Sequence, residues 1–431
     1  MTDDSKENKN AVVISLSGSG SYLLQHMGTL ACLQDSGLVD LNSEVVAYQG
    51  LSGGSMVAAM ANAGFISGFK QSLRERIEDS SFSPAYKEHL IKGFEATESN
   101  ALERVKFLAN EFGEWNKSSE LSWSLSKNFF SQAWGVWRHS GRFDLKSAWS
   151  KLWELMPSKY CSDEWSAPML VYAWKMNNES PVLFTTTKRM IDESSPYKYH
   201  VNMDSSMPTW LPIVASCSVP IACRLVRHKF NGDAYVFHKN KPKDHYDKLA
   251  DGALLDNNPD QYLLSARGFG HLIQEGSSGC ILSVESVDVV SDNSTQGYYV
   301  GNYTSTPNDS WWRWFFLVNI YNVIKGSVLA LLRSKRIEHI ADSMAKQVNE
   351  RDDNFFMILN NKVDVSERFP DKFKKTKIPD STQFTGWTKD QAMAAITQGY
   401  ESALDALSER VTKKNLEKHT GRSARVKSGS A

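Results

Sequence analysis

The chain has 431 residues, of which 41% are hydrophobic and 23% charged, a composition typical of a folded globular protein with one large domain or two. Its 49 basic and 49 acidic residues give a formal net charge of zero, which argues against nucleic acid as the main partner. No run of about 18 or more uncharged apolar residues is present, which argues against a membrane-spanning helix.

Residues 1–10 are polar, and we expect them to form a disordered tail. They lack the apolar core of a signal peptide. The 5 cysteines are scattered, odd in number and without metal-ligand spacing, which suggests reduced thiols. We therefore expect a cytoplasmic protein, with export by a route without a cleaved signal as the alternative.

Residues 11–16 form an apolar run that predicts a buried strand, and the loop Ser-Gly-Ser-Gly-Ser follows it at residues 17–21. A helix is expected to begin at about Tyr22 and to end before Gly37, where a left-handed cap is favoured. A dinucleotide-binding loop would need a third glycine where Leu23 stands. The alternative is an oxyanion hole, because backbone N–H groups at a helix N-terminus carry the positive end of the helix dipole.

Residues 50–54, Gly-Leu-Ser-Gly-Gly, fit the pattern Gly-x-Ser-x-Gly of a nucleophile elbow, in which a serine stands on a sharp turn between a strand and a helix. The context agrees, because a short buried strand is expected at 44–48, before the pattern, and a helix of small residues is expected at 55–63, after it. The candidate nucleophile is therefore Ser52. Its presence favours the oxyanion interpretation of the glycine loop.

Between residues 64 and 160, charged helical stretches alternate with aromatic ones, and few strand signals occur. This segment predicts a helical insertion after the nucleophile helix. Two interpretations stay open. The insertion is either a lid over the sheet or a set of helices that only pack against the sheet's flank.

Strand patterns return at residues 168–173, 182–186 and 280–284, and a helix is expected from residue 210 that ends before Pro220. This alternation of strands and helices predicts an α/β fold. We expect a mainly parallel central sheet with helices on both faces.

Asp251 stands before Gly252 in a polar segment that continues as Asp-Asn-Asn-Pro at residues 256–259. Taken alone, an aspartate before a glycine is typical of a turn. In a chain that also carries a nucleophile elbow, the same carboxylate is a candidate base.

The C-terminal part shows three features. Residues 311–332 open with an aromatic cluster and predict an amphipathic helix, which either faces a membrane or is buried against the sheet. Thr388 and Gln391 match a capping box for a helix that runs to about Ser408. The basic tail at 410–431 is expected to be flexible, and it is either solvated or in contact with anionic lipid.

Four sequence blocks stand in an order that resembles the patatin-like phospholipases, relatives of the cytosolic phospholipase A group. They are the glycine loop with its helix at 17–30, the elbow at 50–54, Ala215-Ser216 with Pro220, and Asp251-Gly252 with Asp256-Asn257 and Pro259. The resemblance spans about residues 11–290. At two positions the chain departs from the family, because Ser19 replaces the usual middle glycine of the loop and Tyr22 stands where arginine is common. Loss of the arginine would weaken binding of a phosphate head group.

We expect a catalytic domain at residues 11–300 with the insertion at 64–160, and a C-terminal helical part at 301–409 that packs on it. The resemblance implies a lipid acyl hydrolase that cleaves carboxylic esters of membrane lipids at a membrane surface. Because the sequence shows no calcium-binding loop of the Asp-x-Asp-x-Asp-Gly kind, we expect no metal or cofactor. In the implied mechanism Ser52 attacks the ester and Asp251 accepts its proton. The N–H groups that would hold the oxyanion are those of Gly18, Ser19, Gly20 and Gly53.

Two other hypotheses stay open. An α/β-hydrolase triad would need a histidine after the aspartate, and His271 or His339 could serve, whereas His26 is interpreted as a packing residue. The second is a catalytically silent lipid-binding protein on the same fold.

Overall fold

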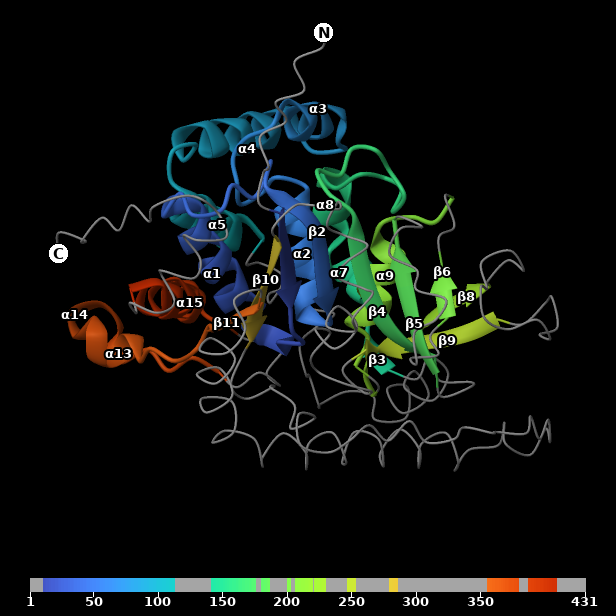
Figure 1. Ribbon diagram of the computed structural model, residues 1–431. Helices are drawn as coiled ribbons and strands as arrows, with labels where there is room; N and C mark the ends of the chain where they lie inside the picture. Colours follow the sequence, from blue (N-terminus) through green and yellow to red (C-terminus); the bar gives the residue numbers. More distant parts are fainter. Residues whose placement is uncertain are drawn as a thin grey trace, which may run out of the picture.

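The computed structural model describes residues 11–112, 141–175, 180–186, 200–202, 206–219, 221–229, 246–252, 279–285, 355–379 and 387–408. Several expectations fall outside these residues: the tail at 1–10, Pro220, the segment 256–259, His271, the helix at 311–332, His339 and the basic tail at 410–431. What is described forms one central sheet with helices packed on it (Figure 1).

The central sheet has the strand order β11-β10-β1-β2-β4-β5-β6, and β9 pairs with both β4 and β8. Its strands are β1 (Ala11–Leu16), β2 (Val45–Leu51), β4 (Met169–Lys175), β5 (Ser180–Thr185), β6 (His200–Asn202), β8 (Val226–Lys229), β9 (Tyr246–Asp251), β10 (Gly279–Glu285) and β11 (Phe355–Leu359). A separate pair of short strands consists of β3 (Gly141–Phe143) and β7 (Ile221–Cys223).

Most pairings in this sheet are parallel. In the described residues, the antiparallel pairs are β4 with β5, β4 with β9, and β8 with β9. Every residue of β1 is buried, as expected for a central strand of a sheet covered on both faces. The predicted α/β fold with a mainly parallel sheet is confirmed.

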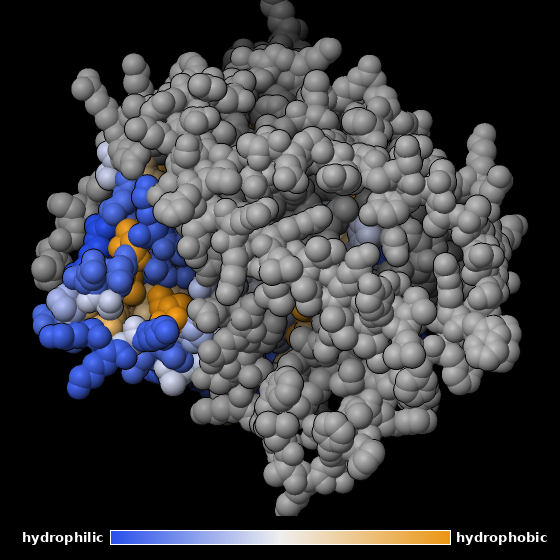
Figure 2. Space-filling model, turned by 90° about the horizontal axis from the view of Figure 1, so that it is seen from below, coloured by the Kyte–Doolittle hydropathy of each residue, from blue (hydrophilic) through white to orange (hydrophobic). Residues whose placement is uncertain are grey.

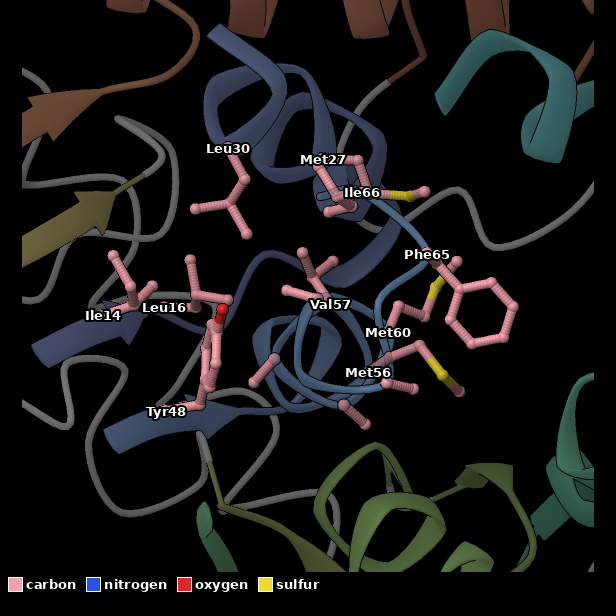
Figure 3. Packing of buried hydrophobic residues seen from close by; sticks show 14 of the residues in the cluster. Ile14, Leu16, Met27, Leu30, Tyr48, Met56, Val57, Met60, Phe65 and Ile66 are labelled. Carbon is pink, nitrogen blue, oxygen red and sulfur yellow. The ribbon is translucent and has the colours of Figure 1, made fainter. Parts of the chain in front are cut away.

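A layer of helices covers one face of the sheet, in the order α15, α1, α2 and α9. The helices are α1 (Leu23–Asp35), α2 (Gly53–Asn62), α9 (Trp210–Ser216) and α15 (Lys389–Ser408), with the short 3-10 helix η1 (Gly20–Tyr22) ahead of α1. Figure 3 shows Ile14 of β1 and Tyr48 of β2 directed toward Leu30 of α1 and Val57 of α2. These apolar contacts fix α1 and α2 on the sheet, and the glycine loop and the elbow lie directly before these two helices.

The last helix packs tightly on the first. A Cβ added to Gly28 of α1 would stand 2.1 Å from the carbonyl oxygen of Ile396, and one added to Gly399 of α15 would stand 1.9 Å from that of Gln25. The two backbones therefore approach more closely than any side chain would allow. The predicted capping box is present, since Thr388 N–H donates to Gln391 Oε1 at 2.8 Å and Gln391 N–H to Thr388 Oγ1 at 3.2 Å.

Most of the described helices of the insertion lie at the sheet edge where the strands begin, whereas the short helix Leu145–Ala148 contacts α9 (Figure 1). They are α3 (Gln71–Asp79), α4 (Pro84–Ala96), α5 (Ala101–Phe112), α7 (Leu145–Ala148) and α8 (Ser150–Leu155). Arg76 donates to the carbonyl of Ala63 just after α2, and Ala101 N–H donates to Asp35 at the end of α1. Both contacts are at the helix ends opposite Ser52, which favours flank packing over a lid for α3 and α5. Residues 113–140 lie outside the described part.

One expectation about the C-terminal part needs correction. Residues 301–409 were expected to be helical, but 355–359 form β11, which pairs in parallel with β10 at the edge of the central sheet. Its sequence, Phe-Phe-Met-Ile-Leu, is a short apolar run of the kind that suits a buried parallel strand. The sheet thus continues past residue 300. The short helices α13 (Val365–Arg368) and α14 (Pro370–Phe373) follow.

The surface near α13 and α14 is mainly hydrophilic, with a few small apolar groups, in the view of Figure 2. Across the described ranges, no helix has the length and apolar character needed to cross a bilayer.

Candidate active site

Ser52 stands on a strained turn between β2 and α2. Its backbone has φ 50° and ψ −128°, and among the described residues it is the only one besides glycine with a positive φ. Such a conformation costs about 1–3 kcal/mol and persists where its surroundings enforce it. The predicted elbow is therefore present, with the serine at the N-cap of α2.

The glycines after Ser52 let the elbow contact the glycine loop. A Cβ on Gly54 would stand 2.4 Å from the carbonyl oxygen of Leu16, and a Cβ on Gly53 would stand 2.6 Å from that of Gly20. Real Cβ atoms do not come this close to backbone atoms, so any side chain would push the loop away. The first turn of α2 and the loop after β1 therefore lie in direct contact.

The side chains of Ser52 and Asp251 meet. Ser52 Oγ donates a hydrogen bond to Asp251 Oδ2 at 2.6 Å, and the two residues are only 5% and 2% exposed. This distance is typical of a hydroxyl bonded to a carboxylate and is within reach for proton transfer. Asp251 is the last residue of β9, so it is a strand end and not an isolated turn residue.

The pairing register of β4 explains why two residues 199 positions apart meet. One edge of β4 pairs with β5. On the other edge β2 ends at Leu51, opposite Tyr172, and the antiparallel β9 ends at Asp251, opposite Ala173. The two strands therefore run toward each other along one edge of β4, and the residues at their ends face each other.

The C-terminal end of α9 holds the backbone of the nucleophile. Ser52 N–H donates to Ser216 Oγ at 2.8 Å, and Ser216 Oγ donates in turn to the carbonyl of Tyr172 at 2.5 Å. Cys217 Sγ donates to the carbonyl of Ser52 at 2.9 Å. Both polar groups of a strained residue are thus held by side chains. The family-like pattern includes Ala215-Ser216 but implies no role for these residues.

His26 of α1 makes a hydrogen bond to the backbone of the glycine loop. Its Nε2 lies 3.1 Å from the carbonyl oxygen of Ser17, and its Nδ1 lies 2.7 Å from Asn360 Nδ2. Because a carbonyl only accepts, Nε2 must carry the hydrogen and Nδ1 must accept. Burial lowers the pKa of His26 to about 4, so the ring is neutral near pH 7. Since the N–H of a trans peptide points opposite to its C=O, the Gly18 N–H points away from His26.

Of the four residues predicted to hold the oxyanion, Ser19, Gly20 and Gly53 lie together. Gly20, with φ 52°, turns the loop into η1. The point where a Cβ on Gly53 would stand is 2.7 Å from Ser19 Oγ and 3.3 Å from Gly20 N. The N-terminus of α2 begins at this same point, so its dipole favours negative charge there. The arrangement can therefore present a hydroxyl nucleophile, a carboxylate base and a cluster of backbone donors to one carbonyl group.

Some residues that the sequence singled out are not among the described ones. Asp256 and Asn257 lie outside the described residues, as do His271 and His339. Within the described ranges, no three His, Cys, Asp or Glu side chains gather in a way that could hold a metal ion.

A solved structure, VipD from Legionella pneumophila, aligns over 95% of this chain and 67% of its own, at 13% identity and a TM-score of 0.34, a likeness too weak to support an assignment. No curated protein matches. The family model of patatin-like phospholipases matches residues 14–264, more than half of the chain. The chain belongs to the patatin-like phospholipase family.

Proposed function

We propose that this chain is a serine hydrolase that cleaves carboxylic esters of membrane lipids through an acyl-Ser52 intermediate. The observation that carries the proposal is the 2.6 Å hydrogen bond from Ser52 Oγ to Asp251 Oδ2, on a strained turn beside a loop of backbone donors. Family membership supports a lipid acyl substrate. The sequence shows no motif for a cofactor, and we expect the rate to be insensitive to EDTA.

In the proposed mechanism Ser52 Oγ attacks the ester carbonyl carbon while its proton passes to Asp251. The carbonyl oxygen becomes negative and is held by the N–H groups of Gly18, Ser19, Gly20 and Gly53, where each donor is worth about 3 kcal/mol of barrier. Asp251 then returns the proton to the leaving alcohol, and the acyl group stays on Ser52. Water, deprotonated by the same carboxylate, attacks the acyl carbon, and the carboxyl group returns its proton to Ser52 Oγ as the fatty acid leaves.

The direct contact between hydroxyl and carboxylate favours a dyad over a triad. In a triad an imidazole stands between the two, whereas here the oxygens touch. His26 cannot be the missing base, because both of its ring nitrogens are engaged with Ser17 and Asn360. We expect a pH profile of kcat/KM without an imidazole inflection near about pH 6.5. An inflection there that His271→Ala abolishes would establish the triad.

The test is hydrolysis of mixed liposomes, with released fatty acids measured by mass spectrometry. Ser52→Ala and Asp251→Asn should each lower the rate by about 10³-fold or more, because either change removes a partner of the proton transfer. Asp390→Asn, a carboxylate change on the exposed start of α15, should leave the rate unchanged. A fluorophosphonate probe should label wild type but not Ser52→Ala. Folded wild type that is neither labelled nor active would instead be a lipid-binding protein.

A further inference from the structure

The hydroxyl of Ser19 is a buried polar group that the fold leaves without a partner. Ser19 has no exposed surface, and among the described side chains its Oγ is one of few buried oxygens with no hydrogen bond. The residue is the N-cap of η1, where a serine side chain commonly accepts from a backbone N–H, yet it makes no capping bond. Because a buried unsatisfied hydroxyl destabilises the folded state, this one needs an explanation other than folding.

The position of this hydroxyl supplies one. Ser19 Oγ lies 2.7 Å from the point where a Cβ on Gly53 would stand, and Gly20 N lies 3.3 Å from the same point. Gly53 directly follows Ser52 and opens α2. The hydroxyl therefore lies against the residue that follows the nucleophile and beside Gly20 N–H, one of the proposed oxyanion donors. Of these two neighbouring donors it is the one on a side chain.

We propose that the Ser19 hydroxyl is a catalytic hydrogen-bond donor to the oxyanion formed at the substrate carbonyl. This inference rests on the proposed function. When Ser52 attacks, the carbonyl oxygen gains a negative charge and becomes a strong acceptor, and Ser19 donates to it without losing its proton. The transferred proton goes to Asp251 alone. A donor that has no partner in the free enzyme and gains one as charge develops lowers the barrier without tightening substrate binding equally.

The test compares wild type with Ser19→Ala and Ser19→Gly on a soluble short-chain p-nitrophenyl ester. In both variants we expect kcat to fall about 10- to 100-fold, in line with the loss of one oxyanion donor, with KM changed by less than about twofold. Inhibition by a trifluoromethyl ketone, whose adduct with Ser52 mimics the intermediate, should weaken by a similar factor. The melting temperature should stay the same or rise, because the variants remove an unsatisfied group.

A buried serine with a structural role provides the control. Ser402 of α15 is 3% exposed, and its Oγ accepts from Val363 N–H at 3.0 Å. Ser402→Ala should lower the melting temperature and keep kcat, the opposite pattern. The inference is wrong if both Ser19 variants keep kcat within about twofold, lose activity only through KM, or lose it together with thermal stability. If wild type itself shows no Ser52-dependent hydrolysis, the proposed function fails first.

Discussion

At the scale of single residues, the neutral ring of His26 links three distant segments. It donates to Ser17 in the glycine loop and accepts from Asn360, which follows β11. If the ring were protonated, Nδ1 would carry a hydrogen and face the amide donor of Asn360. The loop that carries the candidate oxyanion donors is therefore held by a residue that must stay uncharged.

This arrangement makes stability depend on pH. Burial lowers the pKa of His26 to about 4 in the folded protein, whereas in the unfolded chain it is about 6.5. Between about pH 6.5 and pH 4, His26 is therefore protonated in the unfolded chain and neutral in the folded protein. The free energy of unfolding should therefore fall as pH drops through this window, by up to about 3 kcal/mol from this residue. His26→Gln, whose amide can donate and accept at the same two places, should remove this part of the slope in urea unfolding.

The exposed His89, which contacts Glu111 on the surface, gives the comparison. His26→Gln should change the slope of stability against pH more than His89→Gln, which removes a surface imidazole that does not contact the glycine loop. A wild-type slope in His26→Gln would show that the loop does not depend on a neutral imidazole.

At the scale of elements, the contact between α1 and α15 depends on glycine at both helices. Gly399→Ala would drive a methyl group into the carbonyl of Gln25, which is backbone and cannot move alone. Although alanine favours helices by about 1 kcal/mol over glycine, we expect a net loss of about 1–3 kcal/mol. Urea unfolding followed by circular dichroism measures it.

Gly93 of α4 is the matched position, because the atoms that an added Cβ would meet belong to the ring of Phe107. A phenyl ring can turn aside, so Gly93→Ala should cost less than Gly399→Ala. Equal costs would mean that the α1–α15 contact yields as easily as a side chain.

The sequence predicted elements whose signals are local. The elbow at Ser52, the glycine loop and the capping box at Thr388 each depend on a few neighbouring residues, and each is present in the structure. Strand β11 was missed, because five apolar residues suit a helix or a strand equally.

Long-range partners could not be derived in this way. Asn360 lies 334 residues from His26, and no pattern near either one marks the contact. The meeting of Ser52 with Asp251 was predicted only from the resemblance to a family, because it depends on how β2 and β9 share β4. Local periodicity carries no information about such pairings.

At the scale of the whole molecule, we propose that the catalytic unit extends beyond the boundary expected at residue 300. β11 completes the sheet edge, Asn360 supports His26, and α15 covers α1, whose N-terminus carries the glycine loop. These contacts come from the C-terminal part of the chain, yet they hold the candidate site.

A chain shortened to residues 1–354 should therefore lose both cooperative unfolding and esterase activity, because it lacks β11, Asn360 and α15. A chain that ends at residue 408 keeps all three and should fold and turn over the p-nitrophenyl ester. Both can be checked by circular dichroism melts and the ester assay. Activity in the shorter chain would confine the catalytic unit to the residues before 300.

The way β2 and β9 share an edge of β4 has one last consequence. β4 aligns the hydroxyl of Ser52 with the carboxylate of Asp251, although it contributes neither side chain. The distance between the two groups is therefore set by the backbone pairing of β2 and β9 with β4. A slip of β9 by one step along β4 would displace Asp251 by about 3.4 Å and turn its carboxylate to the reverse side of the sheet. The proposed proton transfer therefore requires the observed register of β9 on β4, because no neighbouring register would bring Asp251 to Ser52.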